Sequence, residues 1–142
     1  MSDPTVSILL PTFNQSAAYL RAALLSAKMQ TYPCEIVVVD DGSEPYQGGI
    51  FEEMFRGEVI EHDGSYGLSG PSLIYFWQEN KGVAGALNKA LELSTGEFIQ
   101  WLPSDDLFHI DKTRLQLEAM LTENAMVSYC GYENGIPLPQ DT

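Results

Sequence analysis

Short apolar runs alternate along the chain with segments in which apolar residues return every three or four positions. The runs are rich in β-branched and aromatic residues and are too short for helices, which predicts strands. The predicted strands cover residues 6–10, 35–39, 73–77, 98–102 and 125–129. The periodic segments predict helices at residues 20–27, 46–56, 83–91 and 111–121. Strands and helices in alternation predict an α/β fold with a mostly parallel sheet.

Two residues mark the predicted boundaries around the strand at 98–102. Gly96 follows an apolar-periodic segment and suits the left-handed position that ends many helices. Pro103 ends the strand, because proline has no N–H to donate to a ladder. The chain then presents Ser104, Asp105 and Asp106 at the carboxyl end of that strand.

Polar residues follow three of the predicted strands. They are Pro11–Asn14 after the first strand, Asp40–Ser43 after the second and Ser104–Asp106 after the strand at 98–102. Right-handed crossovers deliver the carboxyl ends of parallel strands to one edge of the sheet, where open α/β sheets bind their ligands. We therefore expect these three loops to converge.

Asp105 and Asp106 place two carboxylates side by side in one of these loops. Adjacent carboxylates repel each other unless a cation or water reaches both, and Mg²⁺ or Mn²⁺ accepts such oxygen ligands. The alternative is a solvated turn that leads into the next helix. Gly82 and Gly85 pose a similar choice, because glycines at a helix start serve either backbone contact with a ligand or close packing on the sheet.

Length and composition suit one globular domain. The chain has 142 residues, of which 44% are hydrophobic and 19% charged. We expect a single domain over residues 1–142, a Gly- and Ser-rich surface insertion at 57–72 with a short strand at 59–60, and a flexible tail at 131–142.

The formal net charge of −13 disfavours nucleic acid and anionic membrane surfaces as partners. A small phosphorylated ligand remains compatible if a metal or a helix N-terminus faces its phosphates. Cys34 and Cys130 have no metal-ligand spacing and predict reduced thiols in a cytoplasmic protein. No apolar run approaches the length of a membrane span.

Five segments resemble, in order, those of the N-terminal nucleotide-sugar-binding part of family 2 glycosyltransferases. They are VSILLPTFN at 6–14, QTY at 30–32, EIVVVDDGS at 35–43, NKGVAGALN at 80–88, and GEFI through the acidic pair at 96–106. The likeness covers residues 6 to about 130. It implies a three-layer α/β/α sandwich with a mostly parallel, Rossmann-like sheet of the GT-A type, here truncated.

The resemblance also implies a donor and a set of site residues. The donor would be a nucleotide-sugar, with a UDP-sugar expected, Mn²⁺ or Mg²⁺ as cofactor, and a glycan, lipid-linked or other acceptor that the sequence does not identify. Asp41 would accept the uracil ring N–H, while Asp105 and Asp106 would hold the metal. The full nucleotide-binding set comprises Pro11, Thr12, Asn14, Asp40, Asp41, Asn80, Gly82, Asn88, Ser104 and Asp105.

The chain departs from the family pattern at two positions. Pro103 stands where the Asp-x-Asp motif has its first acid, and Leu87 stands where the family often has arginine. The catalytic residues are unassigned, because the family's base and acceptor half follow the point where this chain ends; Glu133 and Asp141 lack a supporting motif. The sequence thus predicts an inverting glycosyltransferase domain, too short to act alone, with a non-catalytic nucleotide-sugar-binding or regulatory module as the alternative.

A phosphate-responsive α/β domain such as a response regulator is a third, weaker interpretation. Its acidic cluster would have to lie at the end of the first strand, where this chain has Pro11 and Thr12.

Overall fold

The computed structural model describes residues 3–54, 58–62, 65–69 and 73–134. Its strands are β1 (Val6–Thr12), β2 (Glu35–Asp40), β3 (Glu58–His62), β4 (Ser65–Ser69), β5 (Leu73–Trp77) and β6 (Phe98–Trp101). Its helices are α1 (Ala17–Lys28), α2 (Gly48–Met54), α3 (Gly82–Leu93) and α4 (Lys112–Glu123).

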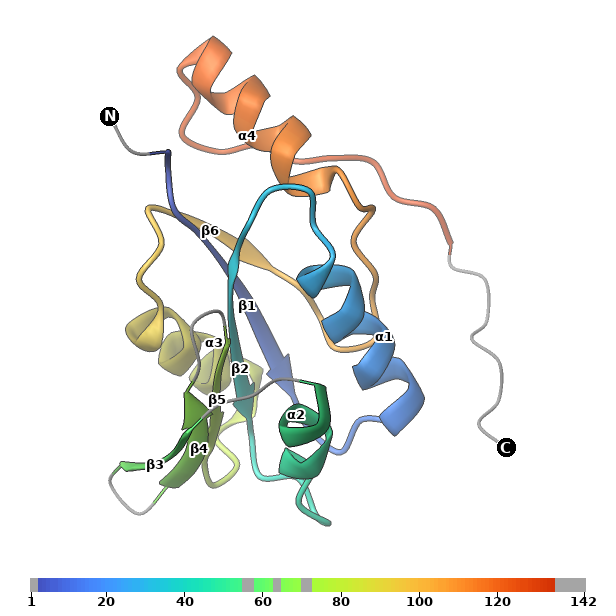
Figure 1. The fold of residues 1–142 in the computed structure, drawn as a ribbon, viewed down its shortest axis with the longest axis vertical. Helices are drawn as coiled ribbons and strands as arrows, with labels where there is room; N and C mark the ends of the chain where they lie inside the picture. Colours follow the sequence, from blue (N-terminus) through green and yellow to red (C-terminus); the bar gives the residue numbers. More distant parts are fainter. Residues whose placement is uncertain (1–2, 55–57, 63–64, 70–72, 135–142) are drawn as a thin grey trace.

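The strands form one sheet in the order β3-β4-β5-β2-β1-β6. β5, β2, β1 and β6 are parallel neighbours, whereas β4 is antiparallel to both β3 and β5. The parallel strands therefore end at one common edge, as Figure 1 shows for β1, β2 and β6. β2 lies inside the sheet between β1 and β5, while β6 pairs with β1 on one side only.

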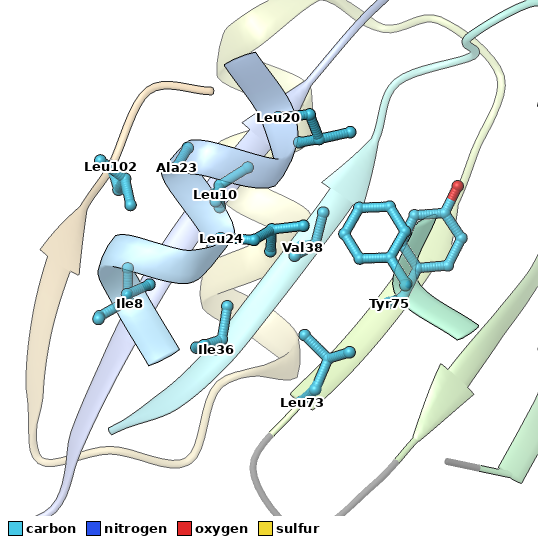
Figure 2. Close-up of a cluster of buried hydrophobic side chains, with 12 residues drawn as sticks. Ile8, Leu10, Leu20, Ala23, Leu24, Ile36, Val38, Leu73, Tyr75 and Leu102 are labelled. Carbon is cyan, nitrogen blue, oxygen red and sulfur yellow. The ribbon is translucent and has the colours of Figure 1, made fainter. Parts of the chain in front are cut away.

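Helices cover both faces of the sheet. On one face α1 lays Leu20, Ala23 and Leu24 over the inward side chains of β1 and β2 (Figure 2). α2 adds Phe51, whose ring stacks on Tyr75 with centroids 4.2 Å apart. On the other face α3 packs its small residues against the strands. This second cluster comprises Leu9, Val37, Val39, Phe76, Ala86 and Ala90.

The predicted three-layer α/β/α fold with a mostly parallel sheet is confirmed. α2 lies within the helical segment expected at 46–56, and β3 contains the strand expected at 59–60. The segment predicted to be mainly a surface insertion carries β4 as well and extends the sheet. Its status as an insertion and the flexible tail at 131–142 stay predictions, and residues 135–142 lie outside the described residues.

Two local predictions are wrong. Residues 125–129 are not a strand, and Met126, Val127 and Tyr129 are more than four-fifths exposed there. Gly96 does not take the left-handed conformation, since α3 ends at Leu93 and its C-cap is the extended Ser94. Glycine at 96 is needed for space instead, because a Cβ there would lie 2.6 Å from the backbone nitrogen of Ser7 on β1.

Among the described residues, no helix combines the length and the apolar character that crossing a membrane requires.

Candidate functional site

The carboxyl ends of β5, β2, β1 and β6 form one edge of the sheet, which we call the C-terminal rim. Thr12 at the end of β1 lies in register with Asp40 at the end of β2. The ladder continues past both strands, because Asp41 N–H donates to the Thr12 carbonyl at 2.9 Å and Gln78 N–H donates to the Asp40 carbonyl at 2.9 Å. The expected convergence of the loops after β1, β2 and β6 is confirmed by this sheet order.

Side-chain hydrogen bonds join the loops of the rim. Asn14 takes a positive φ of 48° and receives the Glu44 N–H on its Oδ1 at 2.8 Å, while its own N–H donates to the Ser43 hydroxyl at 2.8 Å. Gln15 Nε2 donates to Ser104 Oγ at 3.1 Å. The loop after β1 therefore holds the loop after β2 on one side and the loop after β6 on the other.

Asp40 is completely buried and both of its carboxylate oxygens are occupied. Oδ1 accepts the Ser43 N–H at 2.8 Å, and Oδ2 accepts the Tyr75 hydroxyl at 2.8 Å. The Tyr75 ring is in turn fixed by stacking on Phe51. Asp40 therefore fixes the turn after β2 through internal hydrogen bonds, and its buried carboxylate is not at the surface of the rim.

Asp41 is also buried, with 3% of its surface exposed, but only one of its oxygens is fully engaged. Oδ1 accepts Gln78 Nε2 at 2.9 Å and the Lys81 N–H at 2.8 Å. Its main-chain carbonyl accepts Asn80 Nδ2 at 3.1 Å. Within the described part of the chain, no hydrogen bond to Asp41 Oδ2 is found, which leaves an acceptor for a ligand.

Thr12 supplies a second unused group beside Asp41. Its side chain is 3% exposed, and its Oγ1 is buried without a hydrogen-bond partner among the described residues. A buried polar atom without a partner costs stability unless a ligand or water satisfies it. Pro11, the residue before it, is buried in β1 and fixes the strand end without exposing a polar side chain.

The start of α3 lies against the same turn. Gly42 has a φ of 94°, and a Cβ there would approach the Asn80 backbone nitrogen at 3.0 Å. Gly82 opens α3 with a φ of 83° and open space around it, and no side chain caps the helix. Gly85 faces Lys81 of its own helix rather than the sheet, since a Cβ would lie 2.7 Å from Lys81 Cβ.

Asp105 and Asp106 are exposed in a turn closed by the Asp106 N–H, which donates to the Pro103 carbonyl at 3.0 Å. Over the described residues, no three carboxylate, histidine or cysteine side chains cluster as a metal site. One or two exposed carboxylates completed by phosphate and water oxygens are nevertheless a common way to bind Mg²⁺, so the donor set fits a metal brought by a ligand.

Among the predicted site residues, Asn88 is the least connected to the rim. It is exposed on α3, and no hydrogen bond joins it to the rim within the described ranges. Leu87 beside it packs against the core cluster under α3, so the residue in the usual arginine position faces the sheet.

Sequence reasoning did not assign a role to the residues that hold the predicted ones in place, chiefly Gln78, Gln15 and Ser43, of which only Ser43 was named, as part of the loop at 40–43. Each is a polar residue just past a strand that ends at the rim. Gln78 had a usable signal, because it directly follows a strand whose parallel neighbour carries the acidic pair at 40–41.

A cavity of about 680 Å³ lies away from these residues, between β6, α4 and residues 125–128. Lys112 lines it and donates to Gln100 Oε1 at 2.9 Å and to Gln116 Oε1 at 2.6 Å. Burial lowers the pKa of Lys112. This cavity contains none of the predicted site residues.

Comparisons with known proteins agree with this geometry. An uncharacterized glycosyltransferase of Rickettsia typhi is 38% identical over 92% of this chain and 37% of its own length. The structure of residues 1–349 of S. aureus TarS in complex with UDP matches with a TM-score of 0.70 and 26% identity, over 96% of this chain and 38% of that one. The mannosyltransferase PcManGT from Pyrobaculum calidifontis, in complex with GDP-Man and Mn²⁺, matches with a TM-score of 0.66 and 26% identity, over 84% of this chain and 33% of that one.

The chain thus spans little more than a third of the first of these relatives. The family model for glycosyl transferase family 2 matches residues 7–137, most of the sequence. The order of the strands, the acidic loops of the rim and these matches agree, and the chain belongs to glycosyl transferase family 2, with the GT-A fold.

Proposed function

We propose that the C-terminal rim binds a UDP-sugar with a divalent metal, for inverting transfer of the sugar to an acceptor. The observation that carries this proposal is the buried Thr12 Oγ1, which has no partner among the described residues, beside the buried residue Asp41, whose described hydrogen bonds all go to Oδ1. A fixed carboxylate oxygen accepts the ring N–H of uracil, and the neighbouring hydroxyl completes the contact. The UDP complex of TarS, which shares this fold, supports uridine as the nucleoside.

The other residues of the rim would surround the nucleotide. Pro11 and Asn14 border it from the loop after β1, and Asn80, Gly82 and Asn88 from the side of α3. The uncapped start of α3 leaves backbone N–H groups available to an anion. Asp40 acts through Asp41, because its two internal hydrogen bonds fix the turn that carries the outer carboxylate.

The diphosphate would lie beside Ser104, Asp105 and Asp106. At an effective dielectric constant of 20, a carboxylate about 4 Å from a phosphate oxygen is repelled by roughly 4 kcal/mol. Mn²⁺ or Mg²⁺ held by Asp105 and Asp106 would reverse the sign of this interaction, and when bound it stabilises the charge of the departing nucleoside diphosphate. The Mn²⁺ in the PcManGT complex supports a metal at this kind of site.

In the transfer itself an acceptor hydroxyl would attack the anomeric carbon as the bond to the diphosphate breaks. A base must take the hydroxyl proton, and none of the rim carboxylates is assigned that role here. Cys34 and Cys130 are both free thiols, which favours the cytoplasm as the place of the reaction.

Titration calorimetry with UDP, with and without Mn²⁺, tests the proposal. We expect binding with Mn²⁺ and a loss of at least about tenfold in affinity in Asp105→Ala, because a metal ligand is removed. Glu123→Ala is the matched control, since it removes an exposed carboxylate at the far end of α4. UDP affinity that is unchanged by both metal removal and Asp105→Ala would refute the metal role.

The non-catalytic module remains the second candidate. Its support is that Pro103 offers no carboxylate and that Leu87 packs into the core where a cation would face the diphosphate. Incubation of the chain with a panel of UDP-sugars and Mn²⁺ separates the two functions. Release of UDP by hydrolysis or transfer excludes the module, whereas binding without turnover favours it.

A further inference from the structure

Gln78 is a buried polar residue that is held at both its main chain and its side chain. It directly follows β5, and its N–H extends the ladder by donating to the Asp40 carbonyl at 2.9 Å. Its side chain reaches across to the next strand end and donates from Nε2 to Asp41 Oδ1 at 2.9 Å. Only 3% of the residue is exposed, so the amide has a fixed position and little access to water.

The charge of Asp41 is stabilised by amide donors. No ion pair of Asp41 is found in the described part of the chain, and its two donors, Gln78 Nε2 and the Lys81 N–H, both bind Oδ1. The main chain on either side of the carboxylate is fixed by the Thr12 carbonyl and the Asn80 amide. Oδ1 is thus saturated, while Oδ2 is held in place as an acceptor.

We infer that Gln78 is a positioning residue that sets which nucleobases the rim accepts. The inference rests on the proposed function, because it assigns to Gln78 the orientation of the carboxylate that would meet the base. A carboxylate accepts and does not donate, so the amide must present its N–H₂ group to Asp41. Together with the Lys81 N–H, this hydrogen bond fixes the orientation of the Asp41 carboxylate.

The remaining acceptor, Asp41 Oδ2, determines which base can bind. Uracil carries a hydrogen on N3 and can donate to Oδ2, whereas cytosine N3 has only a lone pair and would face the carboxylate acceptor to acceptor. A site built around a substrate N–H strongly rejects an analogue that lacks it. Without the Gln78 donor, Oδ1 keeps only the Lys81 N–H, and the carboxylate can turn away from the orientation that presents Oδ2 to the base. Uracil then loses more affinity than cytosine, because only uracil uses the N–H to Oδ2 contact, so the preference for uracil falls.

Titration calorimetry with UDP and with CDP, each with Mn²⁺, measures this preference as a ratio of affinities. We expect the wild-type chain to prefer UDP, and Gln78→Leu to reduce the ratio about tenfold, the usual effect of one lost hydrogen bond to a charged group. Gln116→Leu is the matched control, because it replaces an amide on α4 that contacts Lys112 and lies away from the rim. It should leave the ratio unchanged.

Gln78→Glu adds a readout that a merely structural role would not produce. At about pH 8 its carboxylate would face Asp41 as a like charge, and UDP selectivity should be poor. Near pH 5.5 the close pair binds a shared proton, and the introduced carboxyl group can again donate to Asp41. The ratio of UDP to CDP affinity, relative to wild type at each pH, should therefore recover on acidification.

The outcomes separate this inference from the proposal on which it rests. Wild-type protein that binds neither nucleotide with Mn²⁺ overturns the proposed function and the inference with it. Wild-type preference for UDP that persists in a folded Gln78→Leu variant overturns the inference alone. If Gln78→Leu does not fold, Gln78→Glu decides, because selectivity that is poor at both pH values or normal at both overturns the inference.

Discussion

The two Asp-Asp pairs of the rim are identical dipeptides, but they differ in exposure and in hydrogen bonding. Asp40 and Asp41 are 0% and 3% exposed, and the structure gives them four hydrogen bonds to their carboxylates. Asp105 and Asp106 are exposed, and within the described ranges neither carboxylate has a hydrogen bond or an ion pair. Both pairs lie at the carboxyl end of a parallel strand, on the same edge of the same sheet.

The position of the strand explains the difference. β2 lies between β1 and β5, so donors from β5, from the residue after it and from the start of α3 reach its carboxylates, while the Thr12 carbonyl of β1 accepts the Asp41 N–H. Among the described strands β6 pairs with β1 alone, and a hydrogen bond between Gln15 and Ser104 joins its loop to the loop after β1. Under the proposed function, the interior pair Asp40–Asp41 is a rigid acceptor for the N–H group of the base. Under the proposed function, the edge pair keeps its charge available for a cation.

The largest effect expected from the contrast between the interior and edge pairs is on the free energy of unfolding. Asp40→Ala leaves the Tyr75 hydroxyl and the Ser43 N–H buried without their acceptor. We expect a loss of about 3 kcal/mol in the free energy of unfolding, measured by urea denaturation. Asp106→Ala, the control at the edge pair, should change stability by less than about 0.5 kcal/mol. Equal losses in the two variants would contradict the contrast between interior and edge.

The next largest effect is on UDP affinity, and its direction depends on whether the metal is present. Replacing both Asp105 and Asp106 by asparagine should weaken UDP binding about tenfold in Mn²⁺, because the metal ligands lose their charge. In a chelator the same variant should bind UDP a few-fold more tightly than wild type, because the repulsion from the diphosphate is removed. Calorimetry in the two buffers measures both changes. A variant that is weaker in both buffers would mean that the edge pair contacts the ligand without a metal.

A smaller effect on stability is expected at the hydrogen bond between the loop after β1 and the loop after β2. Ser43→Ala removes the hydroxyl that accepts the Asn14 N–H at 2.8 Å, and because Asn14 is an exposed residue and this hydrogen bond is only part-buried, water can partly replace the acceptor. We expect a loss of about 1 kcal/mol in the free energy of unfolding by urea denaturation. A loss as large as that of Asp40→Ala would show that the turn after β2 depends on Asn14 as much as on its own carboxylate.

Much of this arrangement could be predicted from the sequence, because apolar periodicity fixes strands and helices, and parallel topology then fixes which loops meet. Burial within the rim could not be predicted. Asp40 and Asp105 have similar local sequences, and only the strand order, with β2 interior and β6 at the edge, distinguishes them. Gly96 was misinterpreted for a related reason, since its need for space comes from Ser7, far away in sequence. Residues 125–129 have a strand-like composition but no strand partner in the described part of the chain.

The smallest expected effect lies at the tie between the loops after β1 and β6. Gln15→Ala removes the hydrogen bond from Gln15 Nε2 to Ser104 Oγ, which is only part-buried. Water can replace it on both sides, so the free energy of unfolding should fall by about 0.5 kcal/mol or less. UDP affinity in Mn²⁺ should fall about twofold to threefold, because the edge pair loses its anchor to the rest of the rim and must be ordered on binding. UDP affinity in chelator should not change, since the edge pair then contributes no attraction. If Gln15→Ala weakens binding equally in both buffers, Gln15 contacts the nucleotide itself, and the loop after β6 does not depend on it for its position.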